Sequence, residues 1–561
     1  MNEETEFEEF APWLVIILTL VGYGLRVLLL NTKGLWLDEA LSVWVSSHRV
    51  AEMLPWIARV DHHPPLYYLL LHYWIALKGD AASDVRLLSV IFGAGTIPLI
   101  YLIGKRMSGV LMGLVAAAFL AFSPFNIRYA QETRMYTLLT FNAAVAIYAL
   151  VRLLTDERAV RPIGSQFREY LRAWRTTAPV ASDTRNEFSY KDKRRDRIGL
   201  SAWIDRHHWL PIQNVETDLA WAVFIVFSVA TMLSHNTAVF FLLATNMLIF
   251  GLMLFQKIKT SGPPLAFQAP SFTNWVKAQT GILLLWGPWI YAFIRQARGV
   301  YQQFYLPKPN LDTVIQTLES FLNEYTLSQA GWVKIVWILY ALVLCLGLVH
   351  YAKKLLPFLF LAALFAVPFL GELAVSIARP IFIDRSLIWT TIPLFLMLAA
   401  GIVQLRFRLL MIVVLGFLAA NNLFSTGDYY RFRQKEDWSG PAGFVANFAR
   451  KNDLVLFNAS EAQIPFDYYF EPYEKKYLIQ VEKRGVPVDL FDSGILEPRM
   501  TESDIPGLIS LIKGRQSLWL VYSHNEYTDP LGLIPHTLAS QMKLLLNRDY
   551  YGVQVQIYVA P

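Results

Sequence analysis

The stretch PPLYYLLLHYWIA, residues 64–76, decides how the whole chain is arranged relative to a membrane. It is apolar but only 13 residues long, contains His72, and is followed by Lys78. A helix needs about 20 apolar residues to cross a bilayer, whereas runs of about 10–14 residues lie at the interface or in a core. We therefore predict that residues 64–76 form an interfacial helix that does not span the membrane. Counting this helix as a span would invert the side of every later loop.

Longer apolar runs lie on both sides of this stretch and predict a mainly α-helical membrane protein with about 11 transmembrane helices. Hydrophobic residues make up 55% of the 561 residues and charged residues only 17%, against about 25% charged in soluble domains. This composition excludes a disordered chain, a basic nucleic-acid-binding surface and a small disulfide scaffold. The predicted spans are residues 11–30, 86–104, 110–126, 135–153, 217–234, 237–255, 275–294, 332–350, 355–377, 386–403 and 408–425.

The Lys and Arg residues predict the orientation, because short cytoplasmic loops carry an excess of them. When residues 64–76 are not counted as a span, the basic loops all fall on one side. The N-terminus is then predicted to be cytoplasmic and the C-terminus outside, in a multi-pass protein of the plasma membrane. The basic segments are 104–109, 256–260, 351–354, 405–408 and a long cytoplasmic insertion at about 152–216.

The part of the chain after the last span has a different pattern. Strand-like stretches at 453–457, 517–523 and 553–559 alternate with helical or turn segments, which is typical of a mixed α/β domain. We therefore predict a transmembrane domain at 1–425 and a small extracytoplasmic α/β domain at 426–561. The single cysteine, Cys345, leaves no disulfide within the chain.

Two adjacent carboxylates, Asp38 and Glu39, follow the first span in LWLDEALSVW (35–44). A carboxylate among apolar neighbours tends to have a raised pKa and can act as a general base. Asp38 could also cap a helix that begins at Glu39 or Ala40. The sequence leaves both roles open.

The same outside loop contains Asp61, His62 and His63, directly before two prolines. The prolines favour an extended entry into the interfacial helix. These polar residues belong either to a functional site or to an ordinary helix start. Two adjacent histidines without a Cys partner or a second spaced His are a weak indication of a metal site.

A second outside corner, SPFNIRYAQETRMYTLLT (123–140), gathers Gln131, Glu132, Arg134 and Tyr136 where the chain re-enters the membrane. Ionisable residues at this depth are functional candidates, and the planar guanidinium of Arg134 suits a phosphate. The alternative is that Arg134 reaches to the lipid headgroups.

Further polar residues are predicted on the same face: His235, Asn236, Arg295, Arg298, Arg379 and Arg385. Together these groups predict a substrate with an anionic group at headgroup depth and a reaction that needs a base. A sugar linked to a polyprenyl phosphate meets this description. The arginines would hold the leaving phosphate, and a carboxylate would deprotonate an acceptor hydroxyl. Such a direct displacement inverts the anomeric centre.

Four motifs in this order resemble a known family: WLDEA (36–40), HHPPL (62–66), RLLSVIFG (86–93) and YAQETRMY (129–136). Over residues 10–250 the chain resembles the N-terminal part of bacterial membrane glycosyltransferases of the GT-C fold. The related families are the dolichyl-phosphate-mannose protein mannosyltransferases and the lipid A aminoarabinose transferases. RPIFIDRSLIW (379–389) is similar to a later Arg-Tyr element of the family, with Ser386 in place of the usual tyrosine.

The resemblance implies an extracytoplasmic active site, a polyprenyl-phosphate sugar donor, and a protein, lipid or polysaccharide acceptor. It implies Asp38 as the base, Glu39 as its neighbour, and Glu132 with Arg134 on the second loop of the site. Arg134 and Arg385 would contact the donor phosphate, and His63 and Glu132 would shape the sugar and acceptor subsites. No cofactor is certain, although a divalent metal could bind Asp38 and Glu132. The expected catalytic residues are Asp38, Glu39 and Glu132. The expected substrate-binding residues are His62, His63, Gln131, Arg134, Tyr136, His235 and Arg385.

Two alternatives from other classes stay open. A transporter or flippase for a lipid-linked glycan would place charges inside its spans, along a central path. Most ionisable residues stand at the ends of the predicted runs instead, and only Arg26 and Glu372 lie further inside them, both near the outer third of their run. The third interpretation is an inactive glycan-binding scaffold in which Asp38 is dispensable and residues 426–561 bind alone.

Overall fold

The computed structural model describes most of the chain. Nearly all of the insertion predicted at about 152–216 lies outside the described residues, as do a few short stretches elsewhere. The described residues are 3–156, 216–258, 267–303, 307–324, 332–352, 354–458, 460–490 and 498–561.

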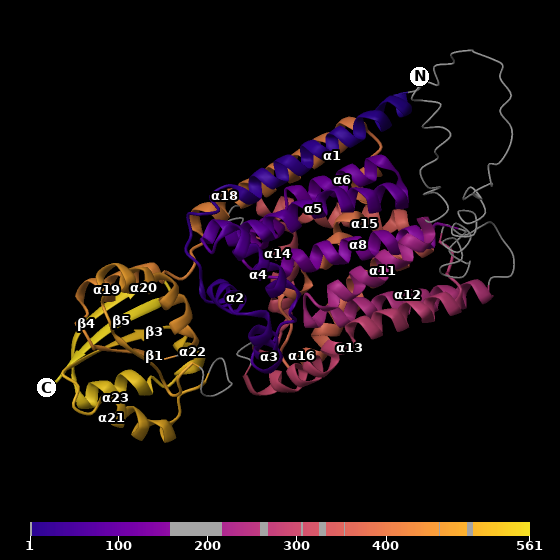
Figure 1. Cartoon of the computed structure of the whole chain (residues 1–561). Coiled ribbons are helices and arrows are strands. Elements are labelled where there is room, and N and C mark those ends of the chain that lie inside the picture. The colour runs from indigo at the N-terminus through magenta and orange to yellow at the C-terminus, as the bar shows by residue number, and fades with distance from the viewer. Residues whose placement is uncertain are drawn as a thin grey trace, which may run out of the picture.

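Apolar runs form helices because every backbone N–H and C=O in a bilayer must be paired within the protein. The bundle consists of α1 (Glu3–Val27), α5 (Ala82–Ser108), α6 (Val110–Ala121), α7 (Pro124–Ala130), α8 (Tyr136–Leu154), α11 (Glu216–Met232), α12 (Val239–Ile258), α13 (Phe272–Gln303), α14 (Leu311–Asn323), α15 (Val333–Ala352), α16 (Leu355–Ser376), α17 (Thr391–Val403) and α18 (Arg408–Phe432). Two short 3-10 helices, η3 (Asn236–Ala238) and η4 (Asp384–Thr390), precede α12 and α17. The chain begins at one end of this bundle, and its C-terminal part lies at the other end (Figure 1).

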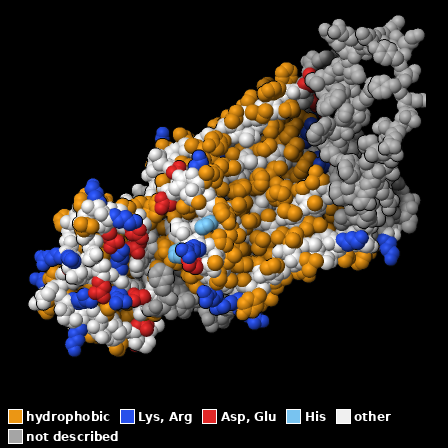
Figure 2. Space-filling model, viewed as in Figure 1, with side chains coloured by type: hydrophobic (Ala, Val, Ile, Leu, Met, Phe, Trp, Pro, Cys, Tyr) orange, Lys and Arg blue, Asp and Glu red, His pale blue; other side chains and the backbone are white. Residues whose placement is uncertain are grey.

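The predicted number of about 11 spans is not confirmed. Within the described residues, eight helices are long and apolar enough to cross a membrane, and the bent pair α6 and α7 would make nine. Helix α11 has only 17 residues, which is shorter than each of the eight. Helix α13 covers another predicted span, but polar residues such as Asn274, Lys277 and Gln279 interrupt its apolar sequence. The surface agrees with a membrane protein, because hydrophobic side chains cover much of the bundle and charged ones gather on the C-terminal part (Figure 2).

Two glycines allow α15 and α17 to cross closely. A Cβ atom on Gly401 would lie 1.8 Å from the carbonyl oxygen of Val343, and one on Gly347 would lie 2.0 Å from that of Met397. Close backbone approach at small residues is a main source of helix association in membranes. Helix α17 with η4 is also the most enclosed of the eight spans, with 94% of its apolar window buried. This crossing fixes the helix that follows Arg385.

We expect Gly401→Ala to destabilise the bundle by about 2 kcal/mol or more, because the new methyl group has no room beside Val343. The measurement is the thermal unfolding midpoint in detergent. Gly416→Ala on α18 is the matched control, since a Cβ there meets no described atom within 4 Å. Equal midpoints for the two variants would contradict this account of the crossing.

The loop between α1 and α5 contains three short helices, α2 (Leu37–Ser47), α3 (Val50–Arg59) and α4 (Leu66–Lys78). Helix α4 contains the stretch that decides the topology. With 13 residues it is about 20 Å long, too short to cross a hydrocarbon core of about 30 Å. It is not among the helices that could span a membrane, as predicted. The backbone N–H of Leu66 donates to the carbonyl oxygen of Leu233, which anchors its start near α11.

The C-terminal part is built on a five-stranded sheet in the order β2-β1-β3-β5-β4. Strands β2 (Glu482–Gly485), β1 (Leu454–Phe457) and β3 (Ser517–Tyr522) are parallel to one another. Strand β5 (Val553–Val559) pairs antiparallel with β3, and β4 (Lys543–Tyr550) pairs antiparallel with β5. Helices α19 (Ser439–Phe448) and α20 (Gln463–Tyr477) pack on one face, and α21 (Ile505–Ile512) and α23 (Leu533–Gln541) on the other. Short elements α22 (Asn525–Thr528), η5 (Ser460–Ala462) and η6 (Glu502–Asp504) complete it.

The three predicted strands are confirmed as β1, β3 and β5. Strands β2 and β4 were missed for physical reasons. The sequence of β2, EKRG, has no apolar residue to suggest burial, and β4 is exposed along nearly its whole length. Neither strand therefore shows the alternation of buried and exposed residues that marks a half-buried strand.

Candidate active site

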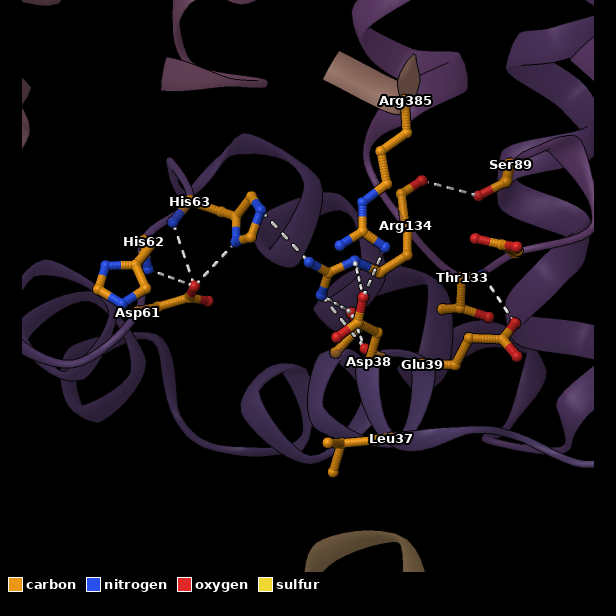
Figure 3. Close-up of polar contacts among 12 residues, drawn as sticks. Leu37, Asp38, Glu39, Asp61, His62, His63, Ser89, Thr133, Arg134 and Arg385 are labelled. Carbon is orange, nitrogen blue, oxygen red and sulfur yellow. Dashed lines mark hydrogen bonds and ion pairs between the residues drawn. The ribbon is translucent and has the colours of Figure 1, made fainter. Parts of the chain in front are cut away.

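Four segments that are distant in sequence meet near the C-terminal part of the structure. They are the first turn of α2, the loop before α4, the segment between α7 and α8, and the start of η4. Figure 3 shows Asp38 facing Arg134 and Arg385, with His63 and Asp61 on the far side of Arg134.

Asp38 lies between two guanidinium groups. Its Oδ2 atom is 3.3 Å from Nη1 of Arg385 and 3.9 Å from Nε of Arg134. Arg134 also donates from Nη1 to the backbone oxygen of Asp38 and to Oγ of Ser42, both at 3.2 Å. The Arg134 side chain is only 2% exposed, whereas Asp38 is 24% exposed. Asp38 is therefore the more exposed side chain of this pair.

Two expectations about Asp38 are wrong. Helix α2 begins at Leu37 with Trp36 at the N-cap position and no side-chain cap, so Asp38 lies inside the first turn and does not cap it. Burial does raise the pKa of Asp38, as expected, but the charges of Arg134 and Arg385 outweigh burial. The pKa of Asp38 therefore lies below its usual value, so the carboxylate is ionised and held by arginines.

A chain of hydrogen bonds connects Asp61, His63 and Arg134. Oδ1 of Asp61 is 3.0 Å from Nδ1 of His63, and Nη2 of Arg134 is 3.3 Å from Nε2 of the same ring. Because an arginine can only donate, Nε2 must accept and Nδ1 must carry the proton. Burial, followed by the charge of Arg134, lowers the pKa of His63 below its usual value. His63 is therefore neutral at pH 7 and orients the guanidinium of Arg134.

Tyr136 and His235 lie beside this chain, as predicted for residues of one face. The His235 ring centroid is 5.5 Å from that of His63 and 6.2 Å from that of Tyr136. The guanidinium of Arg385 lies 5.8 Å from the centre of the Tyr136 ring. Both residues are well buried, so they form a wall of the site.

Glu39 is directed away from Asp38, into a buried ion-pair network. Its carboxylate receives two bonds from Arg86, at 2.8 and 2.6 Å, one from Nζ of Lys435 at 2.8 Å, and one from the Thr133 backbone N–H at 2.9 Å. Burial raises its pKa, but Arg86 and Lys435 lower it more, to about 2. Glu39 is fully buried, so all of its contacts are structural. Arg86 was predicted only as part of a motif, and Lys435 not at all.

The remaining predicted residues bind other parts of the protein. Gln131 donates to the backbone oxygens of Arg26 and Leu28. Glu132 is buried and contacts Arg128, at 3.7 Å. The backbone oxygen of His62 accepts a bond from Asn236. Arg295 and Arg298 are exposed on α13, and Arg379 donates to the backbone oxygen of Ala297.

The residue after Arg385 also has a structural partner. Oγ of Ser386 donates to Oε2 of Glu372 on α16, at 2.6 Å, and both side chains are buried. A tyrosine at position 386 would not fit this bond, because its hydroxyl is several ångströms further from the backbone. Glu372 thus helps to fix the start of η4, from which Arg385 extends.

The two carboxylates considered for a divalent metal do not form a metal site. Asp38 faces Arg134 and Arg385, and Glu132 faces Arg128. Within the described parts of the chain, no group of three or more His, Cys, Asp or Glu residues could hold an ion. The donor set therefore does not fit a metal, and no step is assigned to one.

Comparisons with known proteins agree with this architecture. The family described as dolichyl-phosphate-mannose-protein mannosyltransferase matches residues 62–163. ArnT from Cupriavidus metallidurans in the apo state is 10% identical, with a TM-score of 0.57 over 99% of this chain and 98% of ArnT. ArnT bound to undecaprenyl phosphate is 11% identical, with a TM-score of 0.55 over 97% of each chain. The apo oligosaccharyltransferase of Archaeoglobus fulgidus is 9% identical, with a TM-score of 0.51 over 99% of this chain and 75% of that enzyme.

The search of curated proteins finds no match. The chain nevertheless has the fold of the GT-C membrane glycosyltransferases, and the resemblance predicted from its first 250 residues is confirmed. It is a multi-pass membrane protein.

Proposed function

We propose that this protein transfers a hexosyl or pentosyl group from a polyprenyl-phosphate donor to an extracytoplasmic acceptor. One observation carries the proposal: a partly exposed carboxylate, Asp38, is held between two arginines where the bundle meets the C-terminal part. Arginines of this kind can bind a phosphate, and a carboxylate can accept a proton from a hydroxyl. The GT-C fold, shared with the ArnT structure that contains undecaprenyl phosphate, supports the same assignment.

In the proposed reaction Arg134 and Arg385 bind the donor phosphate, and Asp38 takes the proton of the acceptor hydroxyl. The acceptor oxygen forms a bond to the anomeric carbon as the bond from that carbon to the phosphate oxygen breaks. The phosphate leaves with the electron pair, and its negative charge is neutralised by the arginines. The anomeric centre is inverted.

The lowered pKa of Asp38 has a place in this scheme. While Arg134 and Arg385 are paired with Asp38, their charges make it a weak base. A phosphate bound to the same guanidinium groups would share those charges, and the pKa of Asp38 would then rise. Donor binding would thereby activate the base only when the leaving group is in place.

We also propose that the active site lies on the extracytoplasmic side of the membrane. The N-terminus is then cytoplasmic and the C-terminal part extracytoplasmic. The division into 1–425 and 426–561 is kept as a working division, with α18 crossing that limit and ending at Phe432. The transport alternative receives less support, because Arg26 and Glu372, which lie away from the ends of their helices' apolar runs, already have partners. Arg26 binds three backbone oxygens, and Glu372 binds Ser386.

The proposal is tested by comparing surface glycans and lipid-linked sugars in wild-type and deletion cells by mass spectrometry. We expect one surface glycan to disappear and one polyprenyl-phosphate sugar to accumulate, which would identify acceptor and donor together. Unchanged glycans and lipids would contradict the proposal. A donor that accumulates only on the cytoplasmic side would support the flippase alternative instead.

The site also predicts a pH dependence. His63 must be neutral to accept from Arg134, and its pKa lies below 6.5. The neutral form is thus fully present above pH 6.5 and is lost as the pH falls through the lowered pKa. We expect kcat/KM to stay constant through neutral pH and to fall only when the pH drops below the usual titration range of histidine, measured with the accumulated lipid-linked sugar. A fall that begins above pH 7 would contradict the assignment of a neutral His63.

A further inference from the structure

The helix that carries Asp38 lacks an N-terminal cap of its own. Trp36 occupies the cap position, and its side chain makes no capping bond. The first backbone N–H groups of a helix have no partner within it, and a negative charge beside them is stabilising. In this protein the partner comes from a distant part of the chain: Oε2 of Glu436 accepts the Leu37 N–H at 3.1 Å.

Glu436 is in turn held by the C-terminal part. Nε1 of Trp438 donates to Oε2 at 2.8 Å, and Nε2 of His524 lies 3.0 Å from Oε1. His524 follows the carboxyl end of β3, and Nδ1 of its ring is 2.9 Å from Oγ of Ser523. Side chains of Glu436 and His524 are only 16% and 17% exposed. The contact is thus a partly buried connection from the sheet to α2.

Lys435, the residue before Glu436, also contacts the first turn of α2. Lys435 binds Glu39, and Glu436 binds the N–H of Leu37. Asp38 lies between these two held residues. The hydroxyl of Tyr469 on α20 also accepts the Leu35 N–H, at 2.6 Å, and helix α2 packs against α20. The first turn of α2 is therefore positioned from the C-terminal part.

We propose that Glu436 and His524 are positioning residues for Asp38: His524 orients the Glu436 carboxylate, which caps α2 and fixes the direction of the Asp38 side chain. The inference rests on the proposed function for its effect on turnover, although the capping contact itself does not. His524 has a left-handed backbone, with φ of 55°. Asn tolerates this conformation better than most residues, so His524→Asn removes the ring with little backbone strain.

The first test is hydrogen–deuterium exchange of the full-length protein in detergent, which needs no substrate. We expect the amides at the start of α2 to exchange about tenfold faster in Glu436→Ala, as for the loss of a helix cap. A smaller increase is expected in His524→Asn, which leaves Glu436 in place. The double variant should match Glu436→Ala, because both residues act through one contact. Arg484→Gln is the control, since this exposed side chain on the edge strand β2 pairs with Asp489 and Glu482.

The second test is turnover with the lipid-linked sugar that accumulates in the deletion strain. We expect kcat to fall about tenfold in Glu436→Ala, while KM for the donor stays within about twofold because Arg134 and Arg385 are unchanged. Glu436→Gln, which keeps an oxygen for Leu37, should retain more activity than Glu436→Ala. If Glu436→Ala does not accumulate, His524→Asn decides the question.

Wild-type exchange and wild-type kcat in Glu436→Ala or in His524→Asn would overturn the inference, as would additive effects in the double variant. A different outcome would be faster exchange in the variants together with no transfer by the wild-type protein. That outcome would support the capping contact and refute the proposed function.

Discussion

Asp38→Asn is expected to lower transfer by at least about 100-fold while leaving the protein folded and inserted. The amide has almost the same shape as the carboxylate but cannot take a proton from a hydroxyl. Asp38 lies on the side of α2 that faces Arg134 and Arg385, and no described residue depends on its Oδ atoms for a buried contact other than these arginines. The loss should therefore appear in kcat.

The measurement is the surface glycan made by deletion cells that express each variant, followed by kcat with the purified lipid-linked sugar. Asp549→Asn is the matched control, because Asp549 is exposed on β4, and it should behave as wild type. Gel filtration in detergent reports folding. Near-normal turnover of a well-folded Asp38→Asn protein would remove Asp38 as the base.

Glu39→Ala is expected to have the largest effect on stability, about 3–5 kcal/mol. The change leaves Arg86 and Lys435 without their shared carboxylate, in a place where Glu39 is fully buried and Arg86 is 2% exposed. An uncompensated buried charge is costly because the protein interior solvates it poorly. The expected result is a much lower unfolding midpoint in detergent, or failure to accumulate.

The control for this prediction is Glu471→Ala, which breaks an exposed pair with Lys475. That pair should contribute at most about 0.5 kcal/mol. Glu39→Gln retains the shape and accepts hydrogen bonds, so it should lie between wild type and Glu39→Ala. If Glu39→Ala keeps the wild-type midpoint but loses transfer, Glu39 has a role in the reaction and the structural assignment is wrong.

The sequence was sufficient to predict which loops meet. The positive-inside pattern placed the segments of Asp38, His63, Arg134 and Arg385 on one face, and the structure brings these residues into contact. The strands β1, β3 and β5 and the short helix α4 were also predictable, because alternation and run length are local properties. What these patterns cannot supply is the partner of each side chain.

Glu39 illustrates this limit. In sequence it is the neighbour of Asp38 and looks equally suited to catalysis. Its partners Arg86 and Lys435 are 47 and 396 residues away, and Lys435 lies in a short linker with no motif. The prediction of a raised pKa for Asp38 was wrong for the same reason. That pKa depends on where the guanidinium groups of Arg134 and Arg385 lie, which the local sequence does not show. The number of about 11 spans is not confirmed within the described residues, because α11 has only 17 residues, polar residues interrupt α13, and α6 and α7 meet at a bend of 58°.

The linker between α18 and α19 has a consequence for protein engineering. Only residues 433–438 separate these helices, yet Lys435 and Glu436 hold both sides of the turn that carries Asp38. A chimaera that exchanges the C-terminal part of this protein with that of a relative must therefore be joined after residue 438 and must keep a histidine at position 524, so that both side chains stay with their own bundle and Glu436 keeps its partner. A fusion point at the apparent end of the membrane helix would exchange part of the active site along with the outer portion.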